Sequence, residues 1–359
     1  MAAIRPRDLL SDSLLERLGG TWAETSQAPG DVAATLSRDI AKLGGAGYLN
    51  VALPPEFGGL GCTLRQAACG QRRLARRAPL TALAVSAHLY WTGAAADACR
   101  AGDDSARWIL LEAARGALFA AGHGAPGVGT QTADGLGTAG GDLRFADPRS
   151  RCEPAGKSGY RFRDGAALSS LTPAWDWLAV HAVHAVHSPA PATAPAPAPA
   201  RSLRRGGPDA VLAFAGRGSR CTPAAFRVAR VQPAGAPGDV FTTSALGWGH
   251  SILASVQYSD ARRAFNAAVA AAAAGGRPPG GGHPLDGWPA AEAGLRLDAM
   301  KAKIAEITHP WPRVPGPAPD LGGQRLIGIY TMRHEVAEGA RRVLALTAQI
   351  TEAAAVAAG

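Results

Sequence analysis

The stretch PPEFGGLGCTLRQAA, Pro54 to Ala68, joins a glycine-rich turn directly to the start of a helix. The two prolines restrict the backbone ahead of the turn, and its glycines permit conformations that other residues avoid. Thr63 and Gln66 have the T-x-x-Q spacing of a capping box, so a helix is expected to begin just after the turn. Such a constrained turn is expected to hold one conformation. It either redirects the chain between two helices or lies beside a bound ligand.

Helical patterns flank this turn on both sides, from residue 8 to about 116. Asp31 is placed to cap the helix before the turn, which glycines at 44, 45 and 47 can end. Residues 79–101 are apolar nearly all round, which predicts a central buried helix. The helix after the turn carries a basic face that we interpret as solvated surface, formed by Arg72, Arg73, Arg76 and Arg77.

A different pattern occupies residues 117–259, where glycine-rich connections separate short alternating segments of the kind that form strands. The predicted strands are GYRFRDG, DWLAVHAV, DAVLAFA, AFRVARV and SILASVQYS. The Pro-Ala alternation of residues 188–202 predicts an extended loop that cannot pack a core. This region is therefore predicted to be a β domain with a long surface loop.

Helical periodicity returns at residue 260, with helices predicted over 261–275, 288–308 and 323–358. The order of helices, strands and helices indicates segregated layers, an α+β fold, rather than βαβ alternation. We predict an N-terminal helical domain over 1–116, a middle β domain over 117–259 and a C-terminal helical domain over 260–359.

Bulk composition indicates a folded globular protein of 359 residues, with 47% hydrophobic and 18% charged residues. The formal net charge is +9, but the basic residues are scattered and no basic, aromatic motif for stacking bases is present, so nucleic-acid binding is not predicted. Five dispersed cysteines suit a reducing cytoplasm better than a disulfide framework. The N-terminus has no continuous apolar segment, and no membrane role is predicted.

The segment LNVALPPEFGGLGCTLRQAACGQRRLARR resembles the acyl-CoA dehydrogenase family, in which a PEEFGGLG-like turn leads into a helix of the N-terminal domain. Four further segments resemble that family in the same order along the chain. They begin at DDSARWILL, GYRFRDGAALSS, SALGWGHSIL and TMRHEVAEGARR. The resemblance implies the family's architecture: an N-terminal helical domain, a barrel-like middle β domain and a C-terminal helical bundle, here shortened.

The resemblance also implies FAD bound between the β domain and the C-terminal helices, with an acyl-CoA or acyl-carrier thioester as substrate. Cofactor contacts are expected on a first strand, at Ala121, Gly122 and His123, and on a second segment, at Ser169 and Ser170. The turn at Pro54 would help to shape the acyl pocket. Dimers or tetramers, formed with identical or different chains, are expected through the C-terminal helices.

The chain departs from the family where catalysis is concerned. A dehydrogenase of this type needs a glutamate to remove an α-proton from the thioester. The helix over 261–275 contains no carboxylate, and the glutamates of the last helix, Glu335, Glu338 and Glu352, have spacings typical of solvated positions. No catalytic base is therefore identified, and Ala167 stands where the family has a lysine near the flavin.

The histidines of HAVHAVH, His181, His184 and His187, suggest a metal site only at first sight. On a strand, alternation places His184 on the face opposite the other two, so the three cannot converge on one ion. Three functions remain open: an acyl-CoA dehydrogenase-like flavoenzyme, a non-catalytic subunit that pairs with a competent chain, and a flavin-dependent monooxygenase on the same fold. His123 and His250 lie in glycine-rich stretches expected near the cofactor or the substrate.

Overall fold

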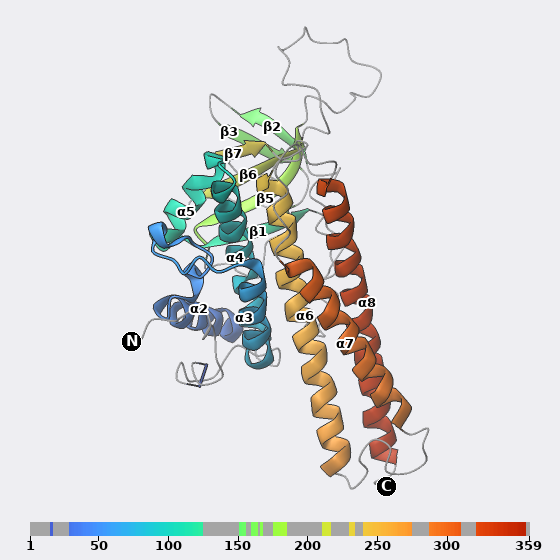
Figure 1. Ribbon diagram of the computed structural model, residues 1–359. Helices are drawn as coiled ribbons and strands as arrows, with labels where there is room; N and C mark the ends of the chain where they lie inside the picture. The colour runs from blue at the N-terminus through green and yellow to red at the C-terminus, as the bar shows by residue number, and fades with distance from the viewer. Residues whose placement is uncertain are drawn as a thin grey trace. The chain divides into compact units, whose positions relative to one another are not determined.

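The protein is described here from a computed structural model, shown in Figure 1. The described residues are 15–16, 29–124, 151–155, 159–163, 166–167, 175–184, 210–216, 230–233, 240–274, 287–309 and 321–356. The chain divides into two compact units, one formed by Met1–Gly93 with Leu246–Gly359 and the other by Ala94–Ala245. The first unit therefore joins the beginning and the end of the chain.

The N-terminal helices are α2 (Pro29–Gly45), α3 (Leu64–Arg77), α4 (Pro79–Arg100) and α5 (Arg107–Ala114). The prediction of a buried helix over 79–101 is confirmed by α4, whose side chains are buried over most of its length. The cap predicted at Asp31 is wrong, because α2 begins at Pro29 and Asp31 lies within its first turn. Proline is favoured at the first position of a helix, because an N–H group there would have no partner within the helix.

The glycine-rich turn between α2 and α3 folds back on itself. It contains two short 3-10 helices, η2 (Tyr48–Asn50) and η3 (Pro55–Phe57), and the amides of Gly61 and Cys62 donate to the carbonyls of Leu53 and Val51 at 2.8 Å. Gly58 and Gly61 have positive φ angles of 78° and 61°, which favour glycine. The glycines are therefore required by the backbone of the turn itself.

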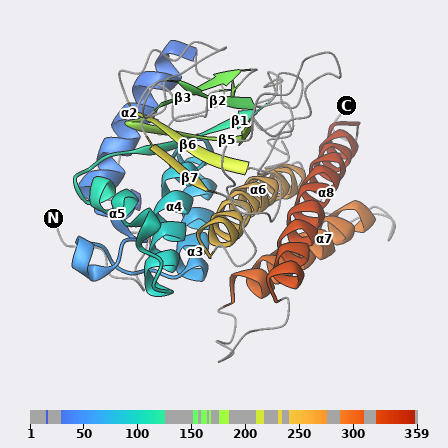
Figure 2. The ribbon, with the colours of Figure 1, turned by 90° about the horizontal axis from the view of Figure 1, so that it is seen from above.

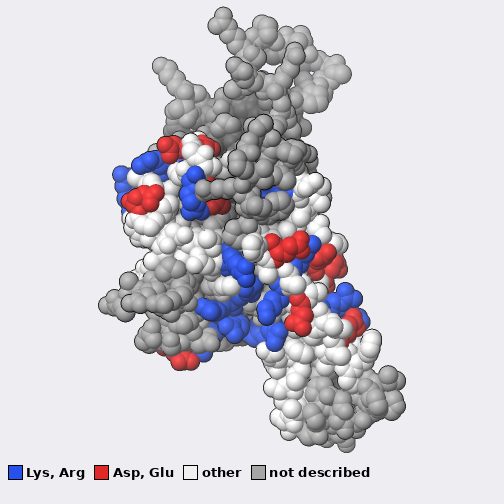
Figure 3. Space-filling model, in the orientation of Figure 1, with Lys and Arg blue, Asp and Glu red and all other residues white. Residues whose placement is uncertain are grey.

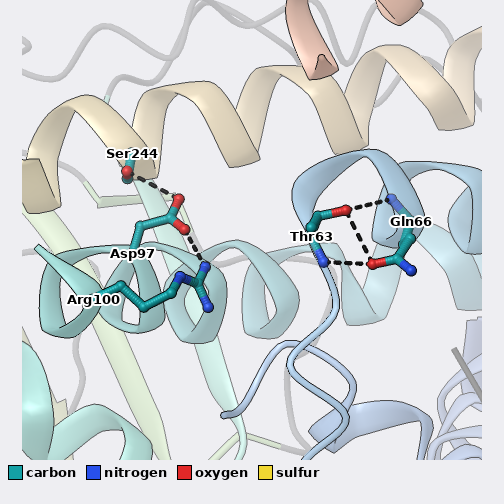
Figure 4. A network of polar contacts seen from close by, with 5 residues as sticks. All are labelled: Thr63, Gln66, Asp97, Arg100 and Ser244. Atoms are coloured by element: carbon teal, nitrogen blue, oxygen red, sulfur yellow. Dashed lines mark hydrogen bonds and ion pairs between the residues drawn. The ribbon is translucent and has the colours of Figure 1, made fainter. Parts of the chain in front are cut away.

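The predicted capping box at the start of α3 is confirmed. Figure 4 shows the Thr63 side chain accepting from the Gln66 amide while the Gln66 side chain accepts from the Thr63 amide. These bonds satisfy backbone donors that would otherwise lack partners at a helix N-terminus.

A buried amide fixes the turn against the helices. Gln71 of α3 accepts from the Tyr48 hydroxyl at 3.0 Å and donates to the Ala82 carbonyl at 2.9 Å and the Ser86 hydroxyl at 3.1 Å. Burial also raises the pKa of the Cys62 thiol in this turn to about 11. Cys62 is thus a packing residue at neutral pH rather than a nucleophile.

The basic face of α3 lies at the surface, as predicted. Arg76 and Arg77 are exposed and Arg72 and Arg73 are half-buried. Arg77 pairs with Glu16 at 3.0 Å. Figure 3 shows Lys and Arg side chains gathered on this face of the molecule.

The second unit contains a sheet built around the strand β5 (Trp177–His184). One edge of β5 pairs along its length with antiparallel β6 (Ala210–Gly216), which pairs in turn with β7 (Arg230–Pro233). The other edge of β5 pairs with two parallel strands. Residues 177–180 of β5 pair with β1 (Phe119–Gly124), and residues 183–184 of β5 pair with β2 (Arg151–Ala155). Strands β3 (Gly159–Arg163) and β4 (Ala166–Ala167) pair with β2 and β1.

The sheet confirms the strands predicted at GYRFRDG, DWLAVHAV and DAVLAFA, while β7 overlaps the end of AFRVARV. Closure of the sheet into a barrel stays a prediction. Residues 188–202, predicted as a loop, lie outside the described residues.

The strand predicted at SILASVQYS is wrong. Residues 251–259 lie within α6, a single helix from Val240 to Ala274. The stretch suggested a strand because Ile252, Ala254, Val256 and Tyr258 alternate with other residues. In the structure both sets are mostly buried, since this part of α6 has packed neighbours on several sides.

The chain ends in α7 (Trp288–Thr308) and α8 (Leu321–Val356), which confirm the predicted helices over 288–308 and 323–358. Figures 1 and 2 show α8 lying along α7 in the C-terminal part of the chain. Their core joins the second half of α6, through Tyr258 and Ala261, to Met300 and Ile304 of α7 and Met332 of α8. In the described ranges no helix has both the length and the apolar character that a membrane span needs.

Candidate functional site

The first strand of the sheet, β1, carries three of the predicted cofactor-binding residues. Ala121 and Gly122 pair with Ala179 and Val180 of β5, and His123 pairs with Ala167 of β4. Ser169 and Ser170 lie outside the described residues. The role of all five in binding a cofactor stays a prediction.

An acidic side chain holds the beginning of β1 in register with β5. The Asp176 carboxylate accepts from the Leu118 amide at 2.9 Å, and the amides of Asp176 and Trp177 donate to the Leu118 carbonyl at 2.9 and 3.0 Å. Leu118 is therefore bonded through both of its backbone groups to the residues that open β5. In the sequence Asp176 is the first residue of the predicted strand DWLAVHAV, and nothing there indicated a role for its carboxylate.

Aromatic side chains cover the same end of the strand pair. Phe119 and Trp177 are register partners, and the ring of Trp108 from α5 lies 5.8 Å from that of Phe119 and 5.2 Å from that of Trp177. Phe119 is fully buried. The aromatic cluster and the Asp176 bonds therefore act on the same two strand starts, and together they join the beginning of β1 to the beginning of β5.

This backbone suits a flavin. Along a strand, successive residues direct their N–H and C=O groups to alternate edges, so only half of those in Phe119–Gly122 serve the pairing with β5. Backbone N–H and C=O groups are the donors and acceptors that the nitrogen and oxygen atoms of an isoalloxazine ring need, and glycine at 122 has no side chain to hinder a close approach. A bound flavin would supply two-electron redox chemistry, and these groups would stabilise the charge that its ring gains on reduction.

Removing the Asp176 carboxylate is expected to weaken this strand start. Asp176→Ala leaves the Leu118 amide without its 2.9 Å acceptor, and we expect a loss of about 1.5 kcal/mol in the free energy of unfolding. The measurement is urea denaturation followed by circular dichroism. Asp176→Asn is the matched control, because it keeps an acceptor oxygen and should lose less than half as much; equal losses for the two variants would contradict this role.

A second group of candidates lies on α6 in the first unit. His250, Ser251 and Ser255 are each almost completely buried. The His250 ring lies 5.5 Å from the Tyr330 ring of α8 in an edge-on arrangement. Within the described residues, the Ser251 and Ser255 hydroxyls have no hydrogen-bond partner.

Burying a hydroxyl that makes no hydrogen bond is unfavourable, because its hydrogen bonds to water are lost and none takes their place. The two hydroxyls lie one helical turn apart, on a helix tied to α3 by the Ser259 hydroxyl, which donates to the Arg72 carbonyl at 3.0 Å. Such groups are ready to bind a polar ligand. Sequence reasoning missed both serines because it assigned them to a strand.

His88 of α4 was also missed. It is buried, and its Nε2 lies 2.9 Å from the Leu49 carbonyl of the glycine-rich turn. Since a carbonyl only accepts, Nε2 carries a proton and donates it. The signal was present in the sequence as one imidazole within the otherwise apolar helix over 79–101.

Among the residues that the structure describes, the carboxylates of the first unit are either partnered or exposed. Buried Asp39 accepts from the Thr81 hydroxyl at 2.7 Å, and Asp260 pairs with Arg263 at 2.7 Å. The three glutamates considered as a catalytic base, Glu335, Glu338 and Glu352, all have exposed side chains. Their predicted solvation is confirmed, and Glu338 also pairs with Arg341.

In the second unit, Asp97 of α4 accepts from the Ser244 hydroxyl of α6 at 3.1 Å and pairs with Arg100, as Figure 4 shows. This contact is a structural link between the two helices. For metals, no group of three or more His, Cys, Asp or Glu side chains able to hold an ion occurs among the residues described.

Solved structures provide the comparison that this chain lacks elsewhere, since no protein-family model and no curated protein matches it. KijD3, in complex with FMN and dTDP-3-amino-2,3,6-trideoxy-4-keto-3-methyl-D-glucose, is 18% identical with a TM-score of 0.65, over 96% of this chain and 83% of that one. Butyryl-CoA dehydrogenase from Megasphaera elsdenii is 14% identical with a TM-score of 0.58, over 96% and 87%.

The chain has the fold of the acyl-CoA dehydrogenases. Dibenzothiophene monooxygenase TdsC from Paenibacillus sp. A11-2 shares it, with 17% identity and a TM-score of 0.57 over 97% of this chain and 83% of that one. The expected acyl-CoA dehydrogenase-like fold is thus confirmed in outline, while the barrel-like form of the middle domain and the shortening of the C-terminal bundle stay predictions. The structures with this fold include both a dehydrogenase and a monooxygenase. The fold therefore does not decide the activity of this chain, which has to be argued from the site.

Proposed function

We propose that this protein is a flavin-dependent oxidoreductase that oxygenates a polar substrate. The observation that carries this proposal is the exposure of Glu335, Glu338 and Glu352, the glutamates of the last helix that were considered as the base of an acyl-CoA dehydrogenase reaction. A base for α-proton removal works best when it is held beside the reacting carbon and shielded from water. Oxygenation by a flavin requires no such carboxylate.

The buried hydroxyls of Ser251 and Ser255 support the polar substrate. An acyl chain offers them no hydrogen bonds, whereas hydroxyl, keto or amino groups do. The amino-keto sugar nucleotide in the KijD3 structure and the thioether-containing aromatic named for TdsC illustrate the range of substrates on this fold. Among these, the sugar type suits the two serines better.

The cofactor is proposed to be a flavin held along β1. The family resemblance implies FAD, whereas the KijD3 structure contains FMN. Heat release of the flavin from purified protein, followed by chromatography, identifies the form. Purification with neither flavin, together with failure to bind added FMN or FAD, would overturn the proposal.

The activity test uses the flavin-loaded chain with a flavin reductase, NADH and oxygen. We expect oxygen consumption coupled to product formation with an amino- or keto-sugar nucleotide, and no bleaching of the oxidised flavin by butyryl-CoA under anaerobic conditions. Bleaching by butyryl-CoA would instead establish the second candidate, acyl-CoA dehydrogenation, which the shared fold with butyryl-CoA dehydrogenase favours. If the chain gains flavin and activity only with another subunit, it is the non-catalytic partner predicted as an alternative.

Alanine substitution of the two serines tests their role. Ser251→Ala and Ser255→Ala each remove an unsatisfied buried hydroxyl, so we expect each variant to gain about 1 kcal/mol in free energy of unfolding without substrate. The same variants should lose affinity for the polar substrate, seen as a raised KM. Ser37→Ala, whose hydroxyl donates to the Ala33 carbonyl at an exposed site, is the control. A loss of stability in the α6 variants would show that the hydroxyls are already bonded.

A further inference from the structure

Helix α3 carries a concentration of positive charge and no acidic residue of its own. Its 14 residues include five arginines and neither Asp nor Glu. Three of the arginines are exposed and two are half-buried, so all five reach the surface. They are Arg65, Arg72, Arg73, Arg76 and Arg77.

This distribution of charge does little to stabilise α3 as a helix. Arg73 lies three and four residues before Arg76 and Arg77, and like charges at these spacings repel each other. The helix dipole favours positive charge in the last turn, which contains Arg76 and Arg77, but not in the first turn, where Arg65 lies. The charges suit the binding of a negatively charged partner better than they suit the helix itself.

Exposed arginines of the C-terminal helices have a different setting. Arg341 of α8 pairs with Glu338 one turn earlier, and Arg296 of α7 lies 3.8 Å from Glu292. Each of these charges is matched by a carboxylate of its own helix. Because α3 has no such carboxylate, it keeps a net positive charge, and charge gathered in this way attracts anions from solution.

One turn of α6 extends the positive charge beyond α3. The Ser259 hydroxyl of α6 donates to the Arg72 carbonyl at 3.0 Å, which places the two helices side by side at this level. Arg262 and Arg263 follow Ser259 by three and four residues and therefore lie on the same side of α6. Arg263 pairs with Asp260 at 2.7 Å. We call the five arginines of α3 together with these two the basic surface, and Figure 3 shows Lys and Arg side chains gathered on this face of the molecule.

The spacing of the arginines on α3 fits carboxylates that are presented by another helix. Arg65, Arg72 and Arg76 follow one another by steps of seven and four residues, which keeps them on one side of α3. Along the helix axis these steps are about 10 Å and about 6 Å. A partner helix with Asp or Glu at the same steps presents its carboxylates at matching intervals. Arginine binds a carboxylate through two parallel N–H···O bonds, which favours this pairing.

Other anionic partners fit the basic surface less well. None of the large apolar side chains exposed in the described part of the chain belongs to α3, so the helix offers no anchor for a lipid surface. It also has no aromatic side chain on which bases could stack. Its two glutamines are already bonded, Gln66 in the capping box and Gln71 in the buried network, and neither is left to read base edges.

We propose that the basic surface binds an acidic helix of a partner protein. The interaction does not depend on the proposed enzymatic function. Because it rests on opposite charges at the surface, its affinity falls as salt is added.

Fluorescence anisotropy tests this binding with the full chain and a labelled helical peptide of about 20 residues that carries glutamates along one face. We expect binding at about 20 mM salt and a loss of about tenfold in affinity at about 200 mM. Arg65→Gln with Arg76→Gln should weaken binding about tenfold at low salt. Arg296→Gln with Arg341→Gln is the matched control, since it removes two exposed positive charges from α7 and α8 and should bind like the wild type.

Arginine footprinting locates the binding site on the unaltered protein, so the test does not rely on the folding of a variant. Phenylglyoxal modifies accessible arginines, and mass spectrometry identifies the modified positions. We expect the bound peptide to protect Arg65 and Arg76, while Arg296 and Arg341 stay reactive. Circular dichroism checks that each variant used for anisotropy is folded.

The same measurements define the results that would overturn the proposal. They are an absence of peptide binding at low salt, an equal loss of affinity in the control variant, or protection of Arg296 and Arg341 rather than Arg65 and Arg76. Tighter binding of a DNA duplex of about 20 base pairs, or of phosphatidylserine vesicles, would also overturn it, because the surface would then serve nucleic acid or lipid.

Discussion

Replacing Gly59 by alanine is expected to lower the free energy of unfolding by about 3 kcal/mol or more, at the upper end for overpacking a rigid site. A Cβ at this position would lie 2.1 Å from the Leu53 carbonyl oxygen and 2.5 Å from that of Asn50. Both atoms belong to the backbone of the same turn, so neither can move without breaking the turn's hydrogen bonds. Guanidinium denaturation followed by circular dichroism measures the loss.

Gly45→Ala provides the comparison for this change. It adds the same methyl group at the end of α2, where nothing lies within 4 Å of the new atom, and we expect a change of less than about 1 kcal/mol. A Gly59→Ala variant as stable as Gly45→Ala would show that the turn relaxes easily. The close packing assigned to it here would then be incorrect.

Gly93→Ala is expected to have the second large effect, a loss of about 3 kcal/mol. The new Cβ would lie 2.3 Å from Cδ2 of Trp248, and the Trp248 ring is fully buried, so it has little room to move aside. Thermal and chemical unfolding of the variant give the loss. Gly294→Ala, inside α7 with nothing within 4 Å, should instead gain up to about 1 kcal/mol from the better helix propensity of alanine.

A double-mutant cycle shows whether the contact with Trp248 causes the loss. Trp248→Leu removes the ring atoms that the new methyl group would strike, at its own cost in buried area. In that background Gly93→Ala should cost less than about 1 kcal/mol, giving a coupling of about 2 kcal/mol. Equal costs in both backgrounds would place the strain elsewhere on α4.

Much of the fold could be predicted from the sequence because several local signals act within a few residues of their effect. Thr63 and Gln66 cap α3, and the glycines of the turn adopt the conformations that require them. The helix over 79–101 is buried over most of its length, as its apolar composition predicts, and strands β3, β5 and β6 form where short alternating segments predicted them. In each case the local pattern and the observed element agree.

Prediction failed where burial on all sides erased the pattern. In α6, Ser251, Ser255 and Ser259 are buried alongside Ile252 and Val256, so no polar face marks the helix and the apolar residues happen to alternate. Ser251 and Ser255 of the candidate site were missed for the same reason, because polar residues that alternate with apolar ones in a buried helix resemble the exposed face of a strand. Neighbours that remove a polar face are distant in sequence, and a local window cannot detect them.

The role of Asp176 could not be predicted for a similar reason. Its partner, Leu118, lies 58 residues earlier in the chain, and nothing local indicates that pairing. Likewise, the three-part division drawn from the sequence follows changes in local pattern, whereas the compact units group the first and last parts of the chain. Contacts across long separations decide both.

The discontinuity of the first unit has a consequence for the nascent chain. Gly93 emerges from the ribosome long before Trp248, its packing partner, and at about 5 to 20 residues per second the delay is roughly 8 to 30 seconds. During that interval the apolar surface of α4 has no α6 to cover it. The growing polypeptide therefore presents a binding site for chaperones at the stage when the strands are being made, and slowing translation beyond residue 100 should increase its capture.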